Sequence, residues 1–138
     1  MANIALADNL GSLDSGLGAV WVADTAKGQV LRLDPRTRQV RARIPVDGEA
    51  LVTVGASAVW VLNERNRLLR IDPATNRVTA RTVLRRPAGG PELSGLEVQI
   101  IAGAPWVIGL EGALRINAGD GRVEHVTRLD QAAADRSG

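Results

Sequence analysis

Short runs of alternating apolar and polar residues follow one another along this chain, and turn-forming residues separate them. A period of two residues indicates β-strands rather than helices. In the middle of the chain the pattern predicts four strands, at residues 50–54, 58–62, 67–71 and 77–84. The sequence therefore predicts an all-β fold.

The strand pattern recurs in three units. Each unit contains a tryptophan block, Ala-Val-Trp-Val around Trp21 and Trp60 and Ala-Pro-Trp-Val around Trp106. A second block follows in each unit and ends at Asp34-Pro35, Asp72-Pro73 and Asn117-Ala118. Repeats of roughly 40 residues with four antiparallel strands are typical of β-propeller blades. We therefore expect about three four-stranded antiparallel blades of a β-propeller.

The alignment of the units divides the chain into segments of one partial propeller domain. We expect the first blade at residues 8–47, the second at 48–86 and the third at 87–130. Residues 1–7 look like an orphan outer strand of another blade, and residues 131–138 look like a polar tail. Propellers typically need about four to eight blades, because each sheet buries its faces only against its neighbours. The ring is thus expected to be incomplete unless the chain forms oligomers.

The three blades can be completed in more than one way. Two copies would give a six-bladed ring, the simplest closed homo-oligomer. The missing blades could instead belong to a longer chain, or the chain could be an engineered propeller fragment.

Three motifs resemble the YVTN and streptogramin-lyase-like family of bacterial β-propellers. They are the blocks at residues 20–24, 32–37 and 70–78, which read VWVAD, RLDPRT and RIDPATNRV. The resemblance covers nearly the whole chain and implies the blade type. It says little about activity, because propellers host binding proteins, sensors and enzymes.

No combination of residues predicts a catalytic centre. His125, the single histidine, stands beside Glu124 on a predicted outermost strand, whereas streptogramin lyases use a constellation of histidine and glutamate. The absence of cysteine excludes disulfides, thiolate metal sites and cysteine nucleophiles. We predict no catalytic residue, no metal and no cofactor. The leading hypothesis is a non-enzymatic binding or interaction module that self-associates; the alternative is part of a lyase or hydrolase with catalytic residues outside this chain.

The remaining candidate residues divide into repeated and variable ones. Trp21, Trp60 and Trp106 recur in each unit and are interpreted as packing between blades, while Asp34, Asp72 and Asn117 are interpreted as turn caps. Variable polar residues on the loops of a rigid scaffold are candidates for contact with a protein or a small-molecule ligand. This candidate face comprises Asp24, Lys27, Asn63, Glu64, Arg65, Glu92 and Glu111.

The charge adds little to this picture. The formal net charge is +2, and the basic residues, nearly all arginines, cluster around residues 36–43 and 65–86. We interpret them as protection of strand edges rather than as a nucleic-acid site, because phenylalanine and tyrosine are absent. No window approaches the roughly 18 apolar residues of a membrane span, and residues 1–10 lack the features of a signal peptide. We expect a soluble chain with no nucleic-acid or membrane partner, in a compartment that the sequence leaves open.

Overall fold

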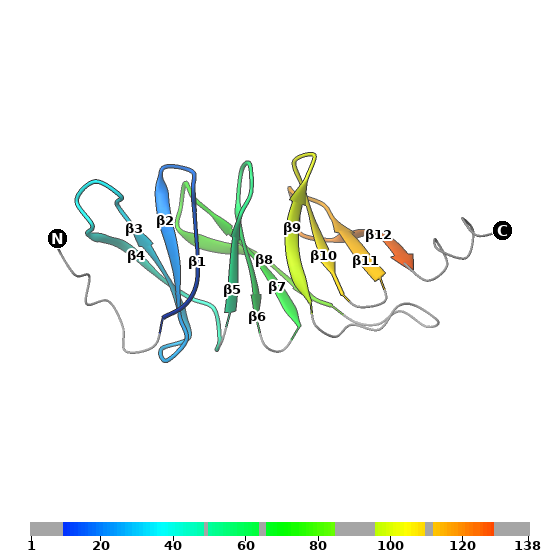
Figure 1. Ribbon diagram of the computed structural model, residues 1–138, viewed down its shortest axis with the longest axis horizontal. Coiled ribbons are helices and arrows are strands. Elements are labelled where there is room, and N and C mark those ends of the chain that lie inside the picture. Colours follow the sequence, from blue (N-terminus) through cyan, green and yellow to red (C-terminus); the bar gives the residue numbers. More distant parts are fainter. Residues whose placement is uncertain (1–9, 49, 64–65, 85–95, 110–111, 129–138) are drawn as a thin grey trace.

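A computed structural model describes residues 10–48, 50–63, 66–84, 96–109 and 112–128 (Figure 1). The described residues form twelve strands and no helix. The strands build three four-stranded antiparallel sheets, in each of which neighbours in sequence are neighbours in the sheet. This arrangement confirms the predicted all-β class and the three four-stranded antiparallel sheets expected of propeller blades.

Each sheet is one blade. Blade 1 consists of β1 (Leu10–Gly16), β2 (Ala19–Asp24), β3 (Gln29–Leu33) and β4 (Val40–Pro45). Blade 2 consists of β5 (Ala50–Val54), β6 (Val59–Asn63), β7 (Arg67–Asp72) and β8 (Arg77–Val83). Blade 3 consists of β9 (Glu97–Ile101), β10 (Ala104–Ile108), β11 (Gly112–Ile116) and β12 (Val123–Arg128). The strands predicted for the middle unit agree with blade 2 to within one residue at each end, whereas the predicted strand at residues 1–7 and tail at 131–138 lie outside the described residues.

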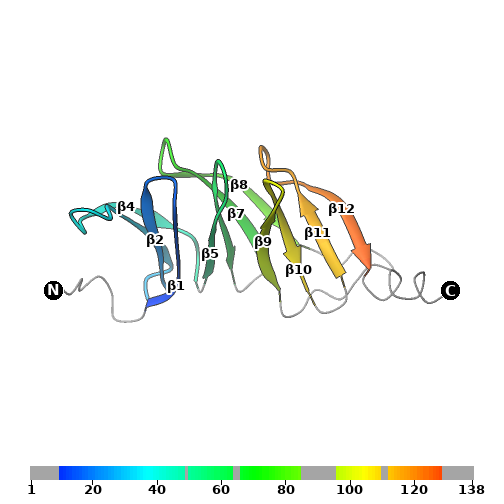
Figure 2. The same ribbon diagram turned by 45° about the horizontal axis from the view of Figure 1, so that its top comes forward.

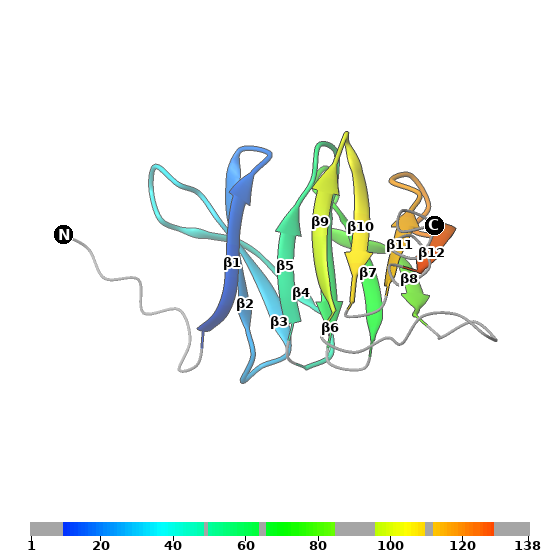
Figure 3. The same ribbon diagram turned by 45° about the vertical axis from the view of Figure 1, so that its right-hand side comes forward.

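The three sheets stack face to face in sequence order (Figures 1 and 2). Their first strands, β1, β5 and β9, lie side by side (Figure 3). Side chains of β1 also bind the backbone of β5: Ser12 Oγ accepts from the Val52 amide at 3.0 Å, and Asp14 Oδ2 accepts from the Val54 amide at 2.8 Å. The edge of one blade is thereby joined to the next.

The hydrophobic core lies between blades. One cluster joins Trp21 and Val30 of blade 1 to Val59 and Ile71 of blade 2. A second cluster joins blades 2 and 3 and is made of Ala58, Trp60, Leu62, Leu68, Leu84, Val107, Leu114 and Ile116. Because strand side chains alternate between the two sides of a sheet, Trp21 and Trp60 each face the blade that follows.

The two outer faces of the stack differ. On blade 1, Leu13 is 65% exposed, whereas Val22, Leu31 and Leu33 on the same side of the sheet are buried. On blade 3, Ile101 is 48% exposed and Trp106 is only partly buried. Trp106 is therefore less buried than Trp21 and Trp60, because no described blade packs against its side of the sheet.

The blades also share the same turn. The turn that joins the third and fourth strands ends in a left-handed residue in every blade: Arg38 (φ 63°), Asn76 (φ 57°) and Gly121 (φ 77°). Asparagine and glycine favour this conformation, and arginine tolerates it less well. The three turns therefore have the same backbone conformation at this position.

Candidate binding site

An arginine on the third strand of blade 1 fastens that blade to blade 2. The Arg32 guanidinium lies over the Trp21 ring, 4.8 Å from its centroid. Its Nη1 donates to the Pro73 carbonyl at 2.5 Å and to Asn76 Oδ1 at 2.6 Å. These acceptors belong to the turn between β7 and β8, so a cation–π contact and two charge-assisted hydrogen bonds act at one junction.

The equivalent arginine of blade 2 binds the turn of blade 3. Arg70, opposite Trp60 in the sheet, donates from Nε to the Ala118 carbonyl at 2.8 Å. Thr82 Oγ1 donates to the Gly121 carbonyl at 2.6 Å. Ala118 follows the turn residue Asn117 as Pro73 follows Asp72, so both arginines bind the equivalent carbonyl of the next blade. We call this set of tryptophan and arginine the clamp.

The sequence interpretation missed the clamp, because it treated the arginines as protection of strand edges. A signal was available in the repeat itself. Arg32, Arg70 and Arg115 stand at the same distance before Asp34, Asp72 and Asn117. Because each repeat makes the same contact with its neighbour, a cation at the same position of every unit predicts the same partner at every junction.

The repeated Asp and Asn residues cap their own turns. Asp34 Oδ1 accepts from the amides of Arg36 at 2.8 Å and Thr37 at 3.2 Å, and Asp72 Oδ1 accepts from the Ala74 amide at 2.8 Å. In blade 3, Asn117 Oδ1 accepts from the amides of Gly119 at 2.8 Å and Asp120 at 3.0 Å.

Asp34 also forms an ion pair with Arg41. The backbone hydrogen bond from Arg36, followed by the side-chain hydrogen bond from Arg41, lowers the pKa of the Asp34 carboxyl from its usual 3.8. The Arg41 Nη2 to Asp34 Oδ2 distance is 3.1 Å. The Asp34 carboxyl therefore stays ionised to a lower pH than an isolated aspartate does, and its ionised form is the one that caps the turn.

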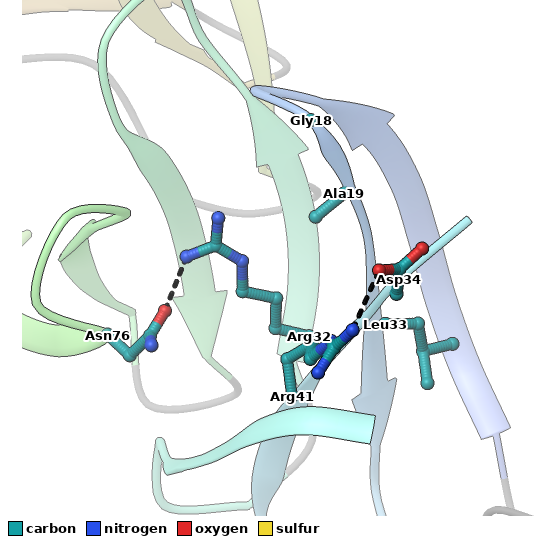
Figure 4. Close-up of a pocket in the computed structure, with 7 residues that line it drawn as sticks. All are labelled: Gly18, Ala19, Arg32, Leu33, Asp34, Arg41 and Asn76. Carbon is teal, nitrogen blue, oxygen red and sulfur yellow. Dashed lines mark hydrogen bonds and ion pairs between the residues drawn. The ribbon is translucent and has the colours of Figure 1, made fainter. Parts of the chain in front are cut away.

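A pocket of about 420 Å³ lies where the turn of blade 1 approaches blade 2 (Figure 4). It is lined by Gly18, Ala19, Arg32, Leu33, Asp34, Arg41 and Asn76. Both arginines already have partners, Asn76 for Arg32 and Asp34 for Arg41. The pocket is polar, and with two arginines and one aspartate its lining carries a formal charge of +1. This charge favours a small polar or anionic molecule over a cation.

Three of the candidate loop residues lie in the part of the chain that the structure describes, and two of these are buried. Asp24 is fully buried, and its carboxylate accepts from the Lys27 amide at 3.3 Å and from Gln29 Nε2 at 3.1 Å. Asn63 is 4% exposed and accepts from the Arg67 amide at 3.1 Å. These two side chains support turns, and Lys27 alone of the described candidates is exposed.

The other four candidates, Glu64, Arg65, Glu92 and Glu111, lie outside the described residues.

The described residues contain no group of three or more His, Asp or Glu side chains that could hold a metal ion. His125 is exposed on β12. Its neighbour Glu124 accepts from Asn117 Nδ2 at 2.6 Å and lies 3.6 Å from Arg115 Nε. Glu124 therefore supports the turn and β11. In the part of the chain that the structure describes, no helix is long and apolar enough to cross a membrane.

No protein-family model matches the chain, and no curated protein matches it by sequence. Solved structures do match. BamB from Moraxella catarrhalis is 15% identical, with a TM-score of 0.68 over 86% of this chain and 34% of that protein. AztD from Citrobacter koseri is 13% identical, with a TM-score of 0.67 over 88% of this chain and 34% of that protein. The fold is a β-propeller.

A third similar structure is the glutaminyl cyclase of Myxococcus xanthus. It is 15% identical, with a TM-score of 0.58 over 94% of this chain and 59% of that protein. The chain thus spans about a third of BamB and of AztD and less than two thirds of the cyclase. At these identities the likeness extends to the fold alone, and the fold does not specify an activity.

Proposed function

We propose that this chain is a non-enzymatic β-propeller interaction module of the YVTN and streptogramin-lyase-like type, which self-associates to complete a ring. The observation that carries the proposal is the outer face of blade 3. There Ile101 is 48% exposed and Trp106 is partly buried, although Trp21 and Trp60 are 0% and 2% exposed. Exposed apolar surface of this kind marks interfaces on soluble proteins.

The residues available for acid–base chemistry support a non-enzymatic role. His125 is exposed on the outermost strand, and Glu124 is held by Asn117 and Arg115. Neither side chain lines the pocket at the junction of blades 1 and 2. The pocket and the exposed loop at Lys27 are the surfaces on which we expect a small-molecule or protein ligand to bind.

The test of self-association is the mass of the chain in solution. One chain has a mass of 14.6 kDa, so a two-copy, six-bladed ring has twice that mass, about 29 kDa. Light scattering across a dilution series from high to low micromolar concentration measures it directly. A mass of one chain throughout, together with a cooperative unfolding transition, would contradict self-association and favour a propeller whose other blades lie in a longer chain.

A further inference from the structure

The outer face of blade 3 carries a third copy of the clamp, which no other described blade contacts. Trp106 lies opposite Arg115 in the sheet, as Trp60 lies opposite Arg70. Thr127 on β12 pairs with Ala113, and Thr82 on β8 pairs with Leu68. Each of these pairs lies two residues before the arginine of its blade, so Thr127 is the equivalent of Thr82. All three side chains that hold blade 3 to blade 2 therefore recur on the far side of blade 3.

This third clamp differs from the others in its exposure. Arg32 and Arg70 are partly buried against the turn of the next blade, whereas Arg115 is exposed. Among the described residues, Arg115 Nε pairs with Glu124 at 3.6 Å, and the Arg115 side chain is 50% exposed. An ion pair so exposed contributes little stability. The Arg115 guanidinium is thus available to a better acceptor.

The clamp has a defined acceptor in each engaged junction. Arg32 binds the Pro73 carbonyl, and Arg70 binds the Ala118 carbonyl. The equivalent carbonyl in blade 1 belongs to Pro35, since Pro35 follows the cap Asp34. No blade precedes blade 1 among the described residues to occupy this turn.

The turn of blade 1 has the shape and the exposure of a vacant acceptor. Arg38 ends it with a φ of 63°, close to the 57° of Asn76 in the turn that receives Arg32. Pro35 and Arg38 are both exposed, whereas their counterparts Pro73 and Asn76 are partly buried against blade 1. Within the described residues there are therefore one clamp and one acceptor turn without a counterpart, and the two match each other.

We infer that the clamp of blade 3 binds the Asp34–Arg38 turn of a second copy, with Arg115 donating to the Pro35 carbonyl beside the Trp106 ring. This inference rests on the proposed self-association and specifies its interface. Two such contacts, related by a two-fold axis, close a ring of six blades. Because Val22, Leu31 and Leu33 are already buried, we expect the apolar part of the contact at Leu13 and along the first strand.

One side chain departs from the repeated pattern. His125 stands opposite Arg115, at the position held by Ala42 in blade 1 and Ala80 in blade 2. An imidazole at this position leaves less room for an incoming turn than a methyl group does. Replacing His125 by alanine is therefore expected to tighten the association.

The first experiment compares two arginine variants of the full chain by analytical ultracentrifugation. Arg115→Ala removes the clamp and is expected to raise the dimer dissociation constant about tenfold or more, as loss of a charge-assisted hydrogen bond does. Arg122→Ala is the matched control, because Arg122 is an exposed arginine of the same blade outside the clamp. It is expected to change the dissociation constant by less than about twofold.

The outcomes separate the inference from the proposed function. If the unaltered chain forms dimers and Arg115→Ala weakens them no more than Arg122→Ala, the interface lies elsewhere and the inference is wrong. If the unaltered chain stays a single copy at all concentrations, both the inference and the proposed self-association are wrong.

A second experiment locates the interface without removing the clamp. Thr82 Oγ1 lies 2.6 Å from the Gly121 carbonyl, and the counterparts of these residues across the proposed interface are Thr127 and Arg38. Because the chain has no cysteine, a mixture of Thr127→Cys and Arg38→Cys chains should form a covalent dimer rapidly on mild oxidation. The control mixture uses Asp120→Cys in place of Arg38→Cys. Equal rates in the two mixtures would overturn the proposed contact.

Discussion

The three tryptophans provide a test of where the core lies, because the same substitution can be made at one repeated position in three environments. Trp21 and Trp60 are 0% and 2% exposed in the junctions between blades, and Trp106 is partly buried. A buried tryptophan removes about 150–250 Å² from water. At about 25 cal/mol per Å² this burial stabilises the fold by roughly 4–6 kcal/mol as an upper bound.

Trp21→Ala and Trp60→Ala are therefore expected to lower the free energy of unfolding by about 3–5 kcal/mol each. Trp106→Ala loses only part of that contact area and is expected to cost about 1–2 kcal/mol. Trp21→Phe, which keeps an aromatic ring but loses the hydrogen bond from Trp21 Nε1 to the Gly16 carbonyl at 3.1 Å, is expected to lie between them.

Urea denaturation followed by far-ultraviolet circular dichroism measures these differences without using tryptophan fluorescence. All variants are compared at one protein concentration, below that at which association is detected, so that Trp106 is not covered by a second copy. If the alanine variant at Trp106 loses as much stability as the variant at Trp21, the core is not confined to the junctions between blades and the reasoning is refuted. If Trp21→Ala unfolds the chain entirely, the ranking of Trp21→Phe and Trp106→Phe decides the question.

Three further predictions follow from local contacts. Arg70→Ala removes the hydrogen bond to the turn of blade 3 and should lower stability by about 1–2 kcal/mol in urea denaturation, whereas Arg122→Ala should leave it within about 0.5 kcal/mol. Because the pKa of the Asp34 carboxyl is lowered on folding, its ionised form stabilises the fold above pH 3.8, and this contribution is lost as the pH falls through the lower pKa of the folded state. The thermal stability of Asp34→Asn should therefore decline less steeply in that acidic range. An unchanged decline would contradict the role of Asp34 as a cap. Gly121→Ala should lower stability by about 1–3 kcal/mol, because φ is +77° and a new Cβ would lie 3.1 Å from that of Ala80. An unchanged melting temperature would contradict this predicted strain between blades 2 and 3.

The strands were predictable because their determinants are local. Alternation of side chains and the Asp-Pro turns specify where each strand of blade 2 begins and ends, and no distant contact is needed to recognise them. The sheet order follows from short turns between consecutive strands.

The use of individual polar residues was less predictable, because it depends on the neighbouring blade or turn. Asp24 and Asn63 look like loop residues in the sequence, yet they are the last residues of β2 and β6, are buried and accept backbone hydrogen bonds. Arg70 looks like an ordinary surface cation until the Ala118 carbonyl is placed beside it. Trp106 has the sequence environment of Trp60, and only the absence of a described fourth blade distinguishes their burial.

The clamp binds a main-chain carbonyl, and this choice of acceptor has a consequence for how such proteins diversify. A proline supplies the carbonyl in one junction and an alanine supplies it in the other. Since every residue type carries the same carbonyl group, the sequence of the turn can change without loss of the bond, provided that the turn keeps its shape. Blades joined in this way can replace one another, because the arginine of any blade can bind the carbonyl of any equivalent turn. A gene can therefore gain, lose or exchange a blade by recombination and still encode the hydrogen bonds between neighbouring blades.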